Sequence, residues 1–388
     1  MLLKNKKIAI IGGGPGGLTL AKLLQLKGVE VKVYERDQNK FARVQGSPLD
    51  LHEQSGLAAL RKAGLLDEFR KHYMPGADKT TITDPTGKIL FSDHEIKRKK
   101  NFGDAHFRPE IDRGVLRMIL LNALEKETVV WDSHFINMEN QDNGWLLHFR
   151  NRQSVYADLV IGADGANSRI RPYLTDIKPF YTGITMLEGN IHKPDSIDLN
   201  INAILKGGKV MAFGKNQNIL MGQKANSEIG FYSSFKTEEG WVANSDVDFS
   251  KGAAALEWFK KAYTDWDPLW QELIEKASSP FVPRPIYCMP LDQQWTSLPN
   301  LTIIGDAAHL MPPFAGEGVN MAMLDALELS EALTNQTSQS MLERIGHFES
   351  NMLKRASMIA QESLDNGEKM HAEDALANML DFFGGSAS

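Results

Sequence analysis

Cysteine is almost absent: Cys288 is the only one among the 388 residues, so no internal disulfide can form. No CxxC motif exists, and the ten histidines have no metal-ligand spacing, which excludes the common zinc motifs. A chain of this length can bury a large core without either kind of cross-link. We therefore expect a globular protein without a metal site, in a reducing compartment such as the cytoplasm.

An excess of basic residues and a long apolar run are also absent. The 49 acidic and 43 basic side chains give a formal net charge of −6, which argues against nucleic-acid binding. The basic run Lys97–Lys100 is short and isolated, and we expect a solvated loop there. No stretch of roughly 18 apolar residues occurs, and the run Ile8–Ile11 is too short for a signal-peptide core. These features predict a cytoplasmic protein without stable membrane association, and we expect a monomer.

What the sequence does contain is a glycine-rich segment, Gly12–Gly17, placed between a strand pattern and a helix pattern. Lys7–Ile11 is a short apolar run typical of a buried parallel strand, and Pro15–Lys27 has helical periodicity. Val29–Glu35 then alternates as a second strand. The segment contains G-x-G-x-x-G, whose glycines allow a tight turn, a close approach of a pyrophosphate and close helix packing, while the helix N-terminus faces the phosphates.

An acidic residue ends the second strand, as a dinucleotide site requires. Glu35 can accept hydrogen bonds from a ribose diol, which favours the unphosphorylated adenosine of FAD. Arg36 beside it would instead suit a phosphorylated ribose. We expect noncovalently bound FAD. The contacts predicted in this segment are Gly12, Gly14, Pro15, Gly17, Glu35 and Arg36.

Two later segments also follow apolar strands. Gly162–Arg169 reads GADGANSR; it predicts a cofactor contact at Asp164 but is equally typical of a strand-to-helix turn with Ser168 as a cap. Gly305–Asn320 reads GDAAHLMPPFAGEGVN, and its Asp306 could hold a second diol at a strand end. We expect His309 to be an ordinary packed core histidine.

The second of these segments also contains the start of a helix. Gly316 and Gly318 open it, and a flavin placed there would have the helix N-terminus against its N1–C2 oxygen edge. The positive end of the helix dipole would stabilise the anionic reduced ring.

Together the three segments resemble the single-component flavoprotein monooxygenases of the para-hydroxybenzoate hydroxylase type, in the same order and at the same separations. They span residues 12 to 320, which is most of the chain. Shorter matches are more specifically similar to the tetracycline-inactivating TetX monooxygenases. These are VYERD at Val33–Asp37, LDLH at Leu49–His52, KAGLL at Lys62–Leu66 and the long Gly305–Asn320 segment.

The sequence pattern and the resemblance predict an α/β fold: a Rossmann-like FAD-binding domain with an inserted β-sheet substrate domain and a long C-terminal helix. We assign residues 1–73, 102–176 and 277–333 to the FAD-binding domain, 74–101 and 177–276 to the substrate domain, and 334–388 to a C-terminal helical region. The helix Met341–Asn366 is expected to pack across both domains, either as a brace or as a gate over the substrate entrance. The tail Phe382–Ser388 is expected to be disordered.

The resemblance also implies individual site residues. Arg43, Asp50, Arg113 and Asp306 match positions that contact FAD, and Pro312 and Gly318 match positions that line the flavin ring. The remaining predicted cofactor contacts are Asp164, Pro313, Gly316, Val319 and Asn320. The predicted substrate contacts are Glu188, Lys209, Met221, Gly230, Pro312, Phe314, Ala315 and Gly316.

The sequence departs from the family at four of its positions. Glu188 and Lys209 fall where the TetX enzymes have glutamine and arginine, and Gly230 falls where they have histidine. Glu317 stands where the family usually has glutamine. Because a carboxylate beside an anionic flavin would be repelled, we expect Glu317 to point away or to be partly protonated.

The resemblance implies a reaction in which no side chain acts as a catalyst. NADPH reduces FAD, O₂ adds to the flavin C4a atom, and the hydroperoxide transfers oxygen to an enol or phenol carbon. The expected substrate is a tetracycline, which hydroxylation would inactivate. The alternatives are hydroxylation of another phenol or polyketide, and a non-catalytic flavoprotein that sequesters a drug. A flavin halogenase is disfavoured, because the cluster Trp266–Trp270 does not have the order of the WxWxIP motif.

Overall fold

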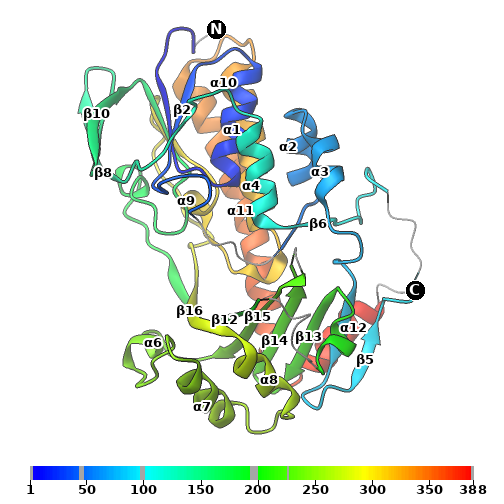
Figure 1. Cartoon of the computed structure of the whole chain (residues 1–388). Coiled ribbons are helices and arrows are strands. Elements are labelled where there is room, and N and C mark those ends of the chain that lie inside the picture. The colour runs from blue at the N-terminus through cyan, green and yellow to red at the C-terminus, as the bar shows by residue number, and fades with distance from the viewer. Residues whose placement is uncertain (1–2, 43–47, 97–100, 193–199, 225–226, 386–388) are drawn as a thin grey trace.

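The computed structural model describes residues 3–42, 48–96, 101–192, 200–224 and 227–385. A five-stranded parallel sheet lies in the upper half of the molecule (Figure 1). Its strands come from three distant parts of the chain, so this half is discontinuous in sequence. In spatial order they are β17 (Leu301–Ile303), β11 (Leu159–Gly162), β1 (Ile8–Ile11), β2 (Val31–Tyr34) and β7 (Val129–Val130).

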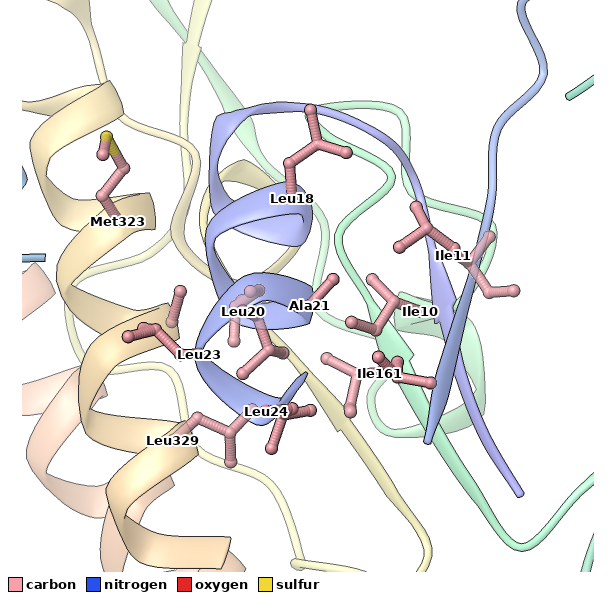
Figure 2. Close-up of a cluster of buried hydrophobic side chains, with 14 of the residues drawn as sticks. Ile10, Ile11, Leu18, Leu20, Ala21, Leu23, Leu24, Ile161, Met323 and Leu329 are labelled. Carbon is pink, nitrogen blue, oxygen red and sulfur yellow. The ribbon is translucent and has the colours of Figure 1, made fainter. Parts of the chain in front are cut away.

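Helix α1 (Pro15–Leu26) packs between this sheet and helix α10 (Gly318–Thr334). Figure 2 shows Ala21 and Leu24 beside Ile10 and Ile161 of the sheet, and Leu23 on the side of α10. Each fully buried leucine contributes about 1.5–3 kcal/mol to this contact. The packing fixes the position of the glycine-rich loop, which joins β1 to α1.

The remaining elements of the upper half complete its surface. They are β3 (Leu49–Asp50), α2 (Gly56–Lys62), α3 (Leu66–His72), β6 (Glu110–Ile111), α4 (Arg113–Asn122), β8 (Phe135–Gln141), β9 (Gly144–Phe149), β10 (Arg152–Ala157), η1 (Arg171–Tyr173), α9 (Asp306–His309) and η4 (Pro313–Ala315).

A seven-stranded sheet lies in the lower half (Figure 1). Helices α5 (Asn202–Leu205), α6 (Trp241–Asn244), α7 (Gly252–Ala262) and α8 (Leu269–Lys276) belong to the same half, and its core includes Phe259, Tyr263 and Trp270. The sheet continues through residue 288, beyond the boundary expected at residue 276. In spatial order the strands are β16 (Ser278–Cys288), β12 (Phe180–Ile191), β15 (Ile229–Lys236), β14 (Gln217–Gln223), β13 (Lys209–Gly214), β4 (Thr80–Thr83) and β5 (Ile89–Ser92).

Three stretches whose sequence pattern predicts one element each form two. The helical pattern of Ser55–Tyr73 forms α2 and α3, and Gly64 adopts a φ of +73° between them. The helical pattern of Ala253–Lys276 forms α7 and α8, and Pro268 precedes the second. The strand pattern of Val155–Ile161 forms the end of β10 in a small antiparallel sheet and the start of β11 in the parallel sheet. Asp158 separates the two strands, and its carboxylate accepts a hydrogen bond from the Lys7 amide at 2.8 Å.

Two helices form the C-terminal region, α11 (Met341–Met370) and α12 (Ala375–Gly385). The first runs four residues beyond the predicted Asn366. The expectation of a disordered tail is wrong for residues 382–385, which belong to α12, and residues 386–388 lie outside the described part. No helix in the described residues is long and apolar enough to cross a membrane.

Helix α11 contacts both halves of the molecule (Figure 1). Glu349 accepts a 2.7 Å hydrogen bond from Thr302 of β17, and Lys236 of β15 forms a 2.6 Å ion pair with Glu368 near the other end of the helix. These contacts suit a brace. The choice between a brace and a gate stays a prediction.

Candidate cofactor and substrate cavity

One cavity of about 1750 Å³ extends from the glycine-rich loop of the upper half to the seven-stranded sheet of the lower half. Most single-ligand pockets enclose roughly 300–1,000 Å³. The cavity therefore has room for a large cofactor and a second molecule together.

The glycine-rich loop forms the upper end of this cavity. At Gly12, φ is +112° and an added Cβ would lie 2.2 Å from the Ala163 carbonyl oxygen, so only glycine fits. At Gly17 an added Cβ would lie 2.2 Å from the Gly12 oxygen, which shows how closely α1 approaches the loop. Around Gly14, the N-cap of α1, no described residue other than its chain neighbours has an atom within 4 Å of the Cβ position. The missing side chain there leaves space inside the cavity, as a bound pyrophosphate requires.

Glu35 lies at the end of β2, where the strand pattern placed it. It is 2% exposed, and its carboxylate accepts hydrogen bonds from the amides of Gly13 at 2.7 Å and Asp37 at 3.0 Å. The carboxylate borders the cavity beside the exposed Arg36. Arg43 and Lys97–Lys100 lie outside the described residues, so the contact predicted for Arg43 and the loop predicted for the basic run stay predictions.

The sequence analysis did not predict Arg117, whose side chain links the glycine-rich loop to the residues that follow β2. Its guanidinium donates to the Gly13 carbonyl oxygen at 3.3 Å and to the Asp37 carboxylate at 2.9 Å. Arg117 follows Arg113 by four residues on α4, so both side chains share one face of the helix. That spacing could have identified it.

Arg113 and Asp306 both line the cavity, and the Arg113 charge favours the ionised form of the Asp306 carboxyl. The Nε atom of Arg113 is buried and has no hydrogen-bond partner among the described residues. Burial raises the pKa of the Asp306 carboxyl above its usual range. Asp306 is positioned by Arg171, a second residue that sequence reasoning missed: its guanidinium donates to the backbone oxygens of Asp306 at 2.8 Å and Ala307 at 2.7 Å.

The sequence left two interpretations open for the segment around Asp164, a cofactor contact and a structural turn, and the position of Asp164 is compatible with both. It borders the cavity, but its carboxylate accepts hydrogen bonds from the Ser168 hydroxyl at 2.6 Å and the Arg169 amide at 2.7 Å. The Ser168 hydroxyl oxygen in turn accepts from the Arg171 amide at 3.0 Å. Asp164 thus organises a turn in the cavity wall, and its direct contact with a cofactor stays a prediction.

The N-terminus of α10 also opens on the cavity. Gly316 adopts a φ of +69°, and Gly318 has no atom within 4 Å of its Cβ position. The neighbouring residues Pro312, Pro313, Phe314, Ala315 and Val319 line the same wall. Asn320 does not line it. Its buried amide joins distant segments, accepting from the His52 amide at 2.9 Å and donating to the Asp50 carbonyl oxygen at 3.0 Å.

The Glu317 carboxylate contacts His52, a partner that the sequence analysis did not predict. Its Oε1 atom lies 2.8 Å from Nδ1 of His52, whose Nε2 lies 3.1 Å from the Asp50 carboxylate. Burial opposes protonation of this imidazole, but the two carboxylates raise the pKa of His52 to about 9. His309 is 3% exposed and pairs with Asp325 at 2.6 Å, which confirms the expectation of a packed core histidine.

The seven-stranded sheet forms the lower wall, and both charged residues predicted to hold substrate are already paired. Lys209 forms an ion pair with the buried Glu110; burial opposes its charge, but the Glu110 carboxylate holds the pKa of Lys209 above its usual range. Glu188 is 6% exposed, pairs with Arg284 and does not line the cavity. Arg284 lines it instead, with Met221 and Gly230.

A protein-family model described as an FAD binding domain matches residues 5–189 and 294–363. This chain belongs to the FAD-binding-domain family. The matched residues include Glu35 and Asp306, together with the segments Gly12–Gly17 and Gly305–Asn320. The open Cβ position of Gly14 and the unpartnered Nε of Arg113 show that the residues present fit an FAD molecule.

Curated relatives and solved structures agree on the fold. A monooxygenase, asqM, of Emericella nidulans is 28% identical, with 84% of this chain and 83% of that protein covered. The 6-hydroxynicotinate 3-monooxygenase of Pseudomonas fluorescens is 25% identical, with 94% and 91% covered. The crystal structure of the tetracycline destructase Tet(51) has a TM-score of 0.72 at 18% identity, with 97% and 95% covered. The fold is that of the FAD-dependent monooxygenases, and the TetX likeness is one of fold.

Proposed function

We propose that this protein is a hydroxylase that uses FAD, NAD(P)H and O₂ to add one oxygen atom to a phenol, an enol or a hydroxylated heteroaromatic ring. In the balanced reaction, one atom of O₂ enters the substrate and the other is reduced to water by the two electrons of NAD(P)H. Substrate C–H, O₂, NAD(P)H and a proton become C–OH, water and NAD(P)⁺. Bound FAD would supply the hydride acceptor and the oxygen activation. The observation that carries the proposal is one continuous cavity. It joins the glycine-rich loop, which suits a dinucleotide, to an apolar wall formed by the seven-stranded sheet.

The side chains at the upper end would hold the cofactor. The amides at the N-terminus of α1 suit the pyrophosphate, Glu35 suits a ribose diol, and Arg113 offers a buried Nε–H group that has no hydrogen-bond partner among the described residues. Asp306 has a carboxylate to which no hydrogen bond is made by the described residues, so it can accept one from a ligand hydroxyl. At the N-terminus of α10, backbone N–H groups and the helix dipole favour negative charge on a reduced cofactor.

The lower wall would orient the substrate and exclude water. Met186, Met211, Leu220 and Met221 present apolar surface to the cavity, and Met side chains adapt to ligands of different shape. Lys209 and Arg284 border this surface, but each is neutralised by a buried carboxylate. The wall therefore suits a flat, largely apolar substrate with a few polar groups.

Tetracycline is the second candidate substrate. The long match at Gly305–Asn320 and the cavity volume favour it. A tetracycline carries a dimethylamino group with which Glu188 could pair, but the ion pair between Glu188 and Arg284 disfavours that contact. A smaller hydroxylated ring, of the kind named for the Pseudomonas fluorescens relative, needs no such contact.

A substrate panel tests the proposal. The purified protein with its bound FAD is mixed with NADPH or NADH and with tetracycline, simple phenols, hydroxylated pyridines or aromatic polyketides. We expect one class to accelerate NAD(P)H oxidation and to gain one oxygen atom by mass spectrometry. A protein that binds panel members without oxidising NAD(P)H would instead be the non-catalytic binder. Oxidation of phenols or pyridines with tetracycline recovered unchanged would remove the second candidate.

A further inference from the structure

His52 lies behind the cavity wall, between the carboxylates of Asp50 and Glu317, two residues that line the cavity. Its Nδ1 atom is 2.8 Å from Oε1 of Glu317 and its Nε2 atom is 3.1 Å from Oδ2 of Asp50, and the residue is 8% exposed. A neutral imidazole has one N–H group and could donate to only one of these carboxylates. The other nitrogen would then face a carboxylate with its lone pair. An imidazolium donates to both, so the geometry requires the charged form or a proton on one carboxylate.

This charged group is fixed to the N-terminus of α10. The His52 amide donates to Asn320 of that helix at 2.9 Å, and Glu317 is the N-cap residue of the same helix. Asp50 also lies close to the residues that precede this helix, because its Oδ1 atom is 3.4 Å from the position that a Cβ atom would take at Gly316. The Oε2 atom of Glu317 is buried and has no partner among the described residues. The histidine therefore holds one oxygen of Glu317 and leaves the other unsatisfied.

Further charges surround the trio. Asp50 faces Lys209 and Arg108, and Glu110 faces Lys209 and His52. With His52 protonated, the three carboxylates of Asp50, Glu110 and Glu317 oppose three cations. With His52 neutral, this group of side chains carries one net negative charge beside the helix that would face the cofactor.

We propose that His52 is a positioning residue that, as an imidazolium, fixes Glu317 and raises the reduction potential of FAD bound at this end of the cavity. The inference rests on the FAD binding of the proposed function. A reduced flavin carries more negative charge than the oxidised form, so a nearby positive charge favours reduction. The effect is strong where water is excluded and weak where solvent screens it. His52 thereby offsets the carboxylate that stands where related enzymes usually have glutamine.

Three variants of the holoprotein test the sign of this effect. The midpoint potential of bound FAD is measured at pH 7 by dye-coupled reduction, without substrate. His52→Gln removes the positive charge and should lower the potential. Glu317→Gln removes the negative charge and should raise it. The double variant should return the potential toward the wild-type value, and His52→Lys should keep it there. His347→Gln, at an exposed position on α11, is the matched control and should leave the potential unchanged.

A second measurement covers the case in which the His52 variants do not fold. The ¹⁵N chemical shifts of the wild-type histidine rings, assigned residue by residue, should show the His52 imidazole with both nitrogens protonated at pH 8, a signal that the His347→Gln control retains. The inference is overturned if no such imidazole exists, or if His52→Gln and Glu317→Gln shift the potential in the same direction. A protein that binds no FAD would instead overturn the proposed function, so the two failures are distinguishable.

Discussion

The two ends of the cavity differ in what they leave available to a ligand. At the upper end, Gly14 and Gly318 leave open space, and the Nε atom of Arg113 has no protein partner among the described residues. At the lower end, the cations Lys209 and Arg284 are already paired with buried carboxylates. The upper end thus suits charge and phosphate, whereas in the proposed function the lower wall recognises its ligand by shape and apolar contact.

The largest expected effect is at the upper end. Gly14→Val should weaken FAD binding at least about 100-fold, because the branched side chain would fill the space left for the pyrophosphate, a steric cost of roughly 3 kcal/mol. Since no protein atom lies within 4 Å of that Cβ position, the melting temperature of the apoprotein should change little. FAD titration by fluorescence measures the loss. Gly384→Val, at a second open position, should retain the cofactor; FAD bound with wild-type affinity by Gly14→Val would contradict the account.

Between the two ends, His52 should make stability depend on pH. Its folded pKa of about 9 exceeds the unfolded value, so its stabilisation is fully present below pH 6.5 and is lost as the pH rises through 9. The full effect is on the order of 3 kcal/mol. Urea unfolding at pH 6, 8 and 10 should show His52→Gln far less stable than the wild type at pH 6 and similar to it at pH 10. An equal difference at all three values would show that His52 is not charged in the folded protein.

The glycine-rich loop could be predicted from the sequence, whereas the contacts of His52 could not. The turn at Gly12–Gly17 and the acid at Glu35 follow from local backbone requirements, and the structure has the strand, loop and helix where the pattern placed them. The trio of Asp50, His52 and Glu317 joins segments 265 residues apart. No local rule specifies such a contact, because it depends on how α10 packs against β3. The LDLH match marked the segment but gave no role to its histidine.

The lower wall shows the same limit for charged side chains. Glu188 was predicted to contact substrate, but its partner is Arg284, 96 residues away on the neighbouring strand β16. The pairing depends on the register that sets Met186 opposite Arg284. The β-rich pattern predicted a sheet in this region without fixing its register, so the alignment could not tell a ligand contact from a cross-strand ion pair.

A smaller effect is expected for Arg113→Met at the upper end. A buried hydrogen bond to a charged group contributes about 1.5–3 kcal/mol, so FAD should bind roughly 10- to 100-fold more weakly. Because Arg113 Nε has no hydrogen-bond partner among the described residues, the apoprotein should melt at nearly the wild-type temperature. Isothermal titration with FAD measures the change. Arg70→Met, which removes an exposed cation paired with Asp67, is the control; equal FAD affinity in both variants would remove Arg113 from the site.

The smallest effect is expected at the lower wall. Arg284→Gln should raise the KM for the preferred substrate only about 2- to 5-fold, or roughly 1 kcal/mol at most, because the guanidinium is half exposed and already paired. The rate of flavin reduction by NADPH alone should not change. Steady-state and stopped-flow kinetics separate the two. A 100-fold rise in KM would mean that the wall recognises its ligand by charge, as the upper end does.

In the proposed function the two ends of the cavity act on one reaction, and labelled oxygen can show whether they do. The holoprotein is supplied with NADPH, ¹⁸O₂ and the substrate that best accelerates NADPH oxidation, and the product is analysed by mass spectrometry. We expect one ¹⁸O atom in the product for each coupled NADPH oxidised. The proposed function is wrong if the oxygen instead derives from labelled water, or if all O₂ becomes hydrogen peroxide while every substrate of the panel stays unchanged.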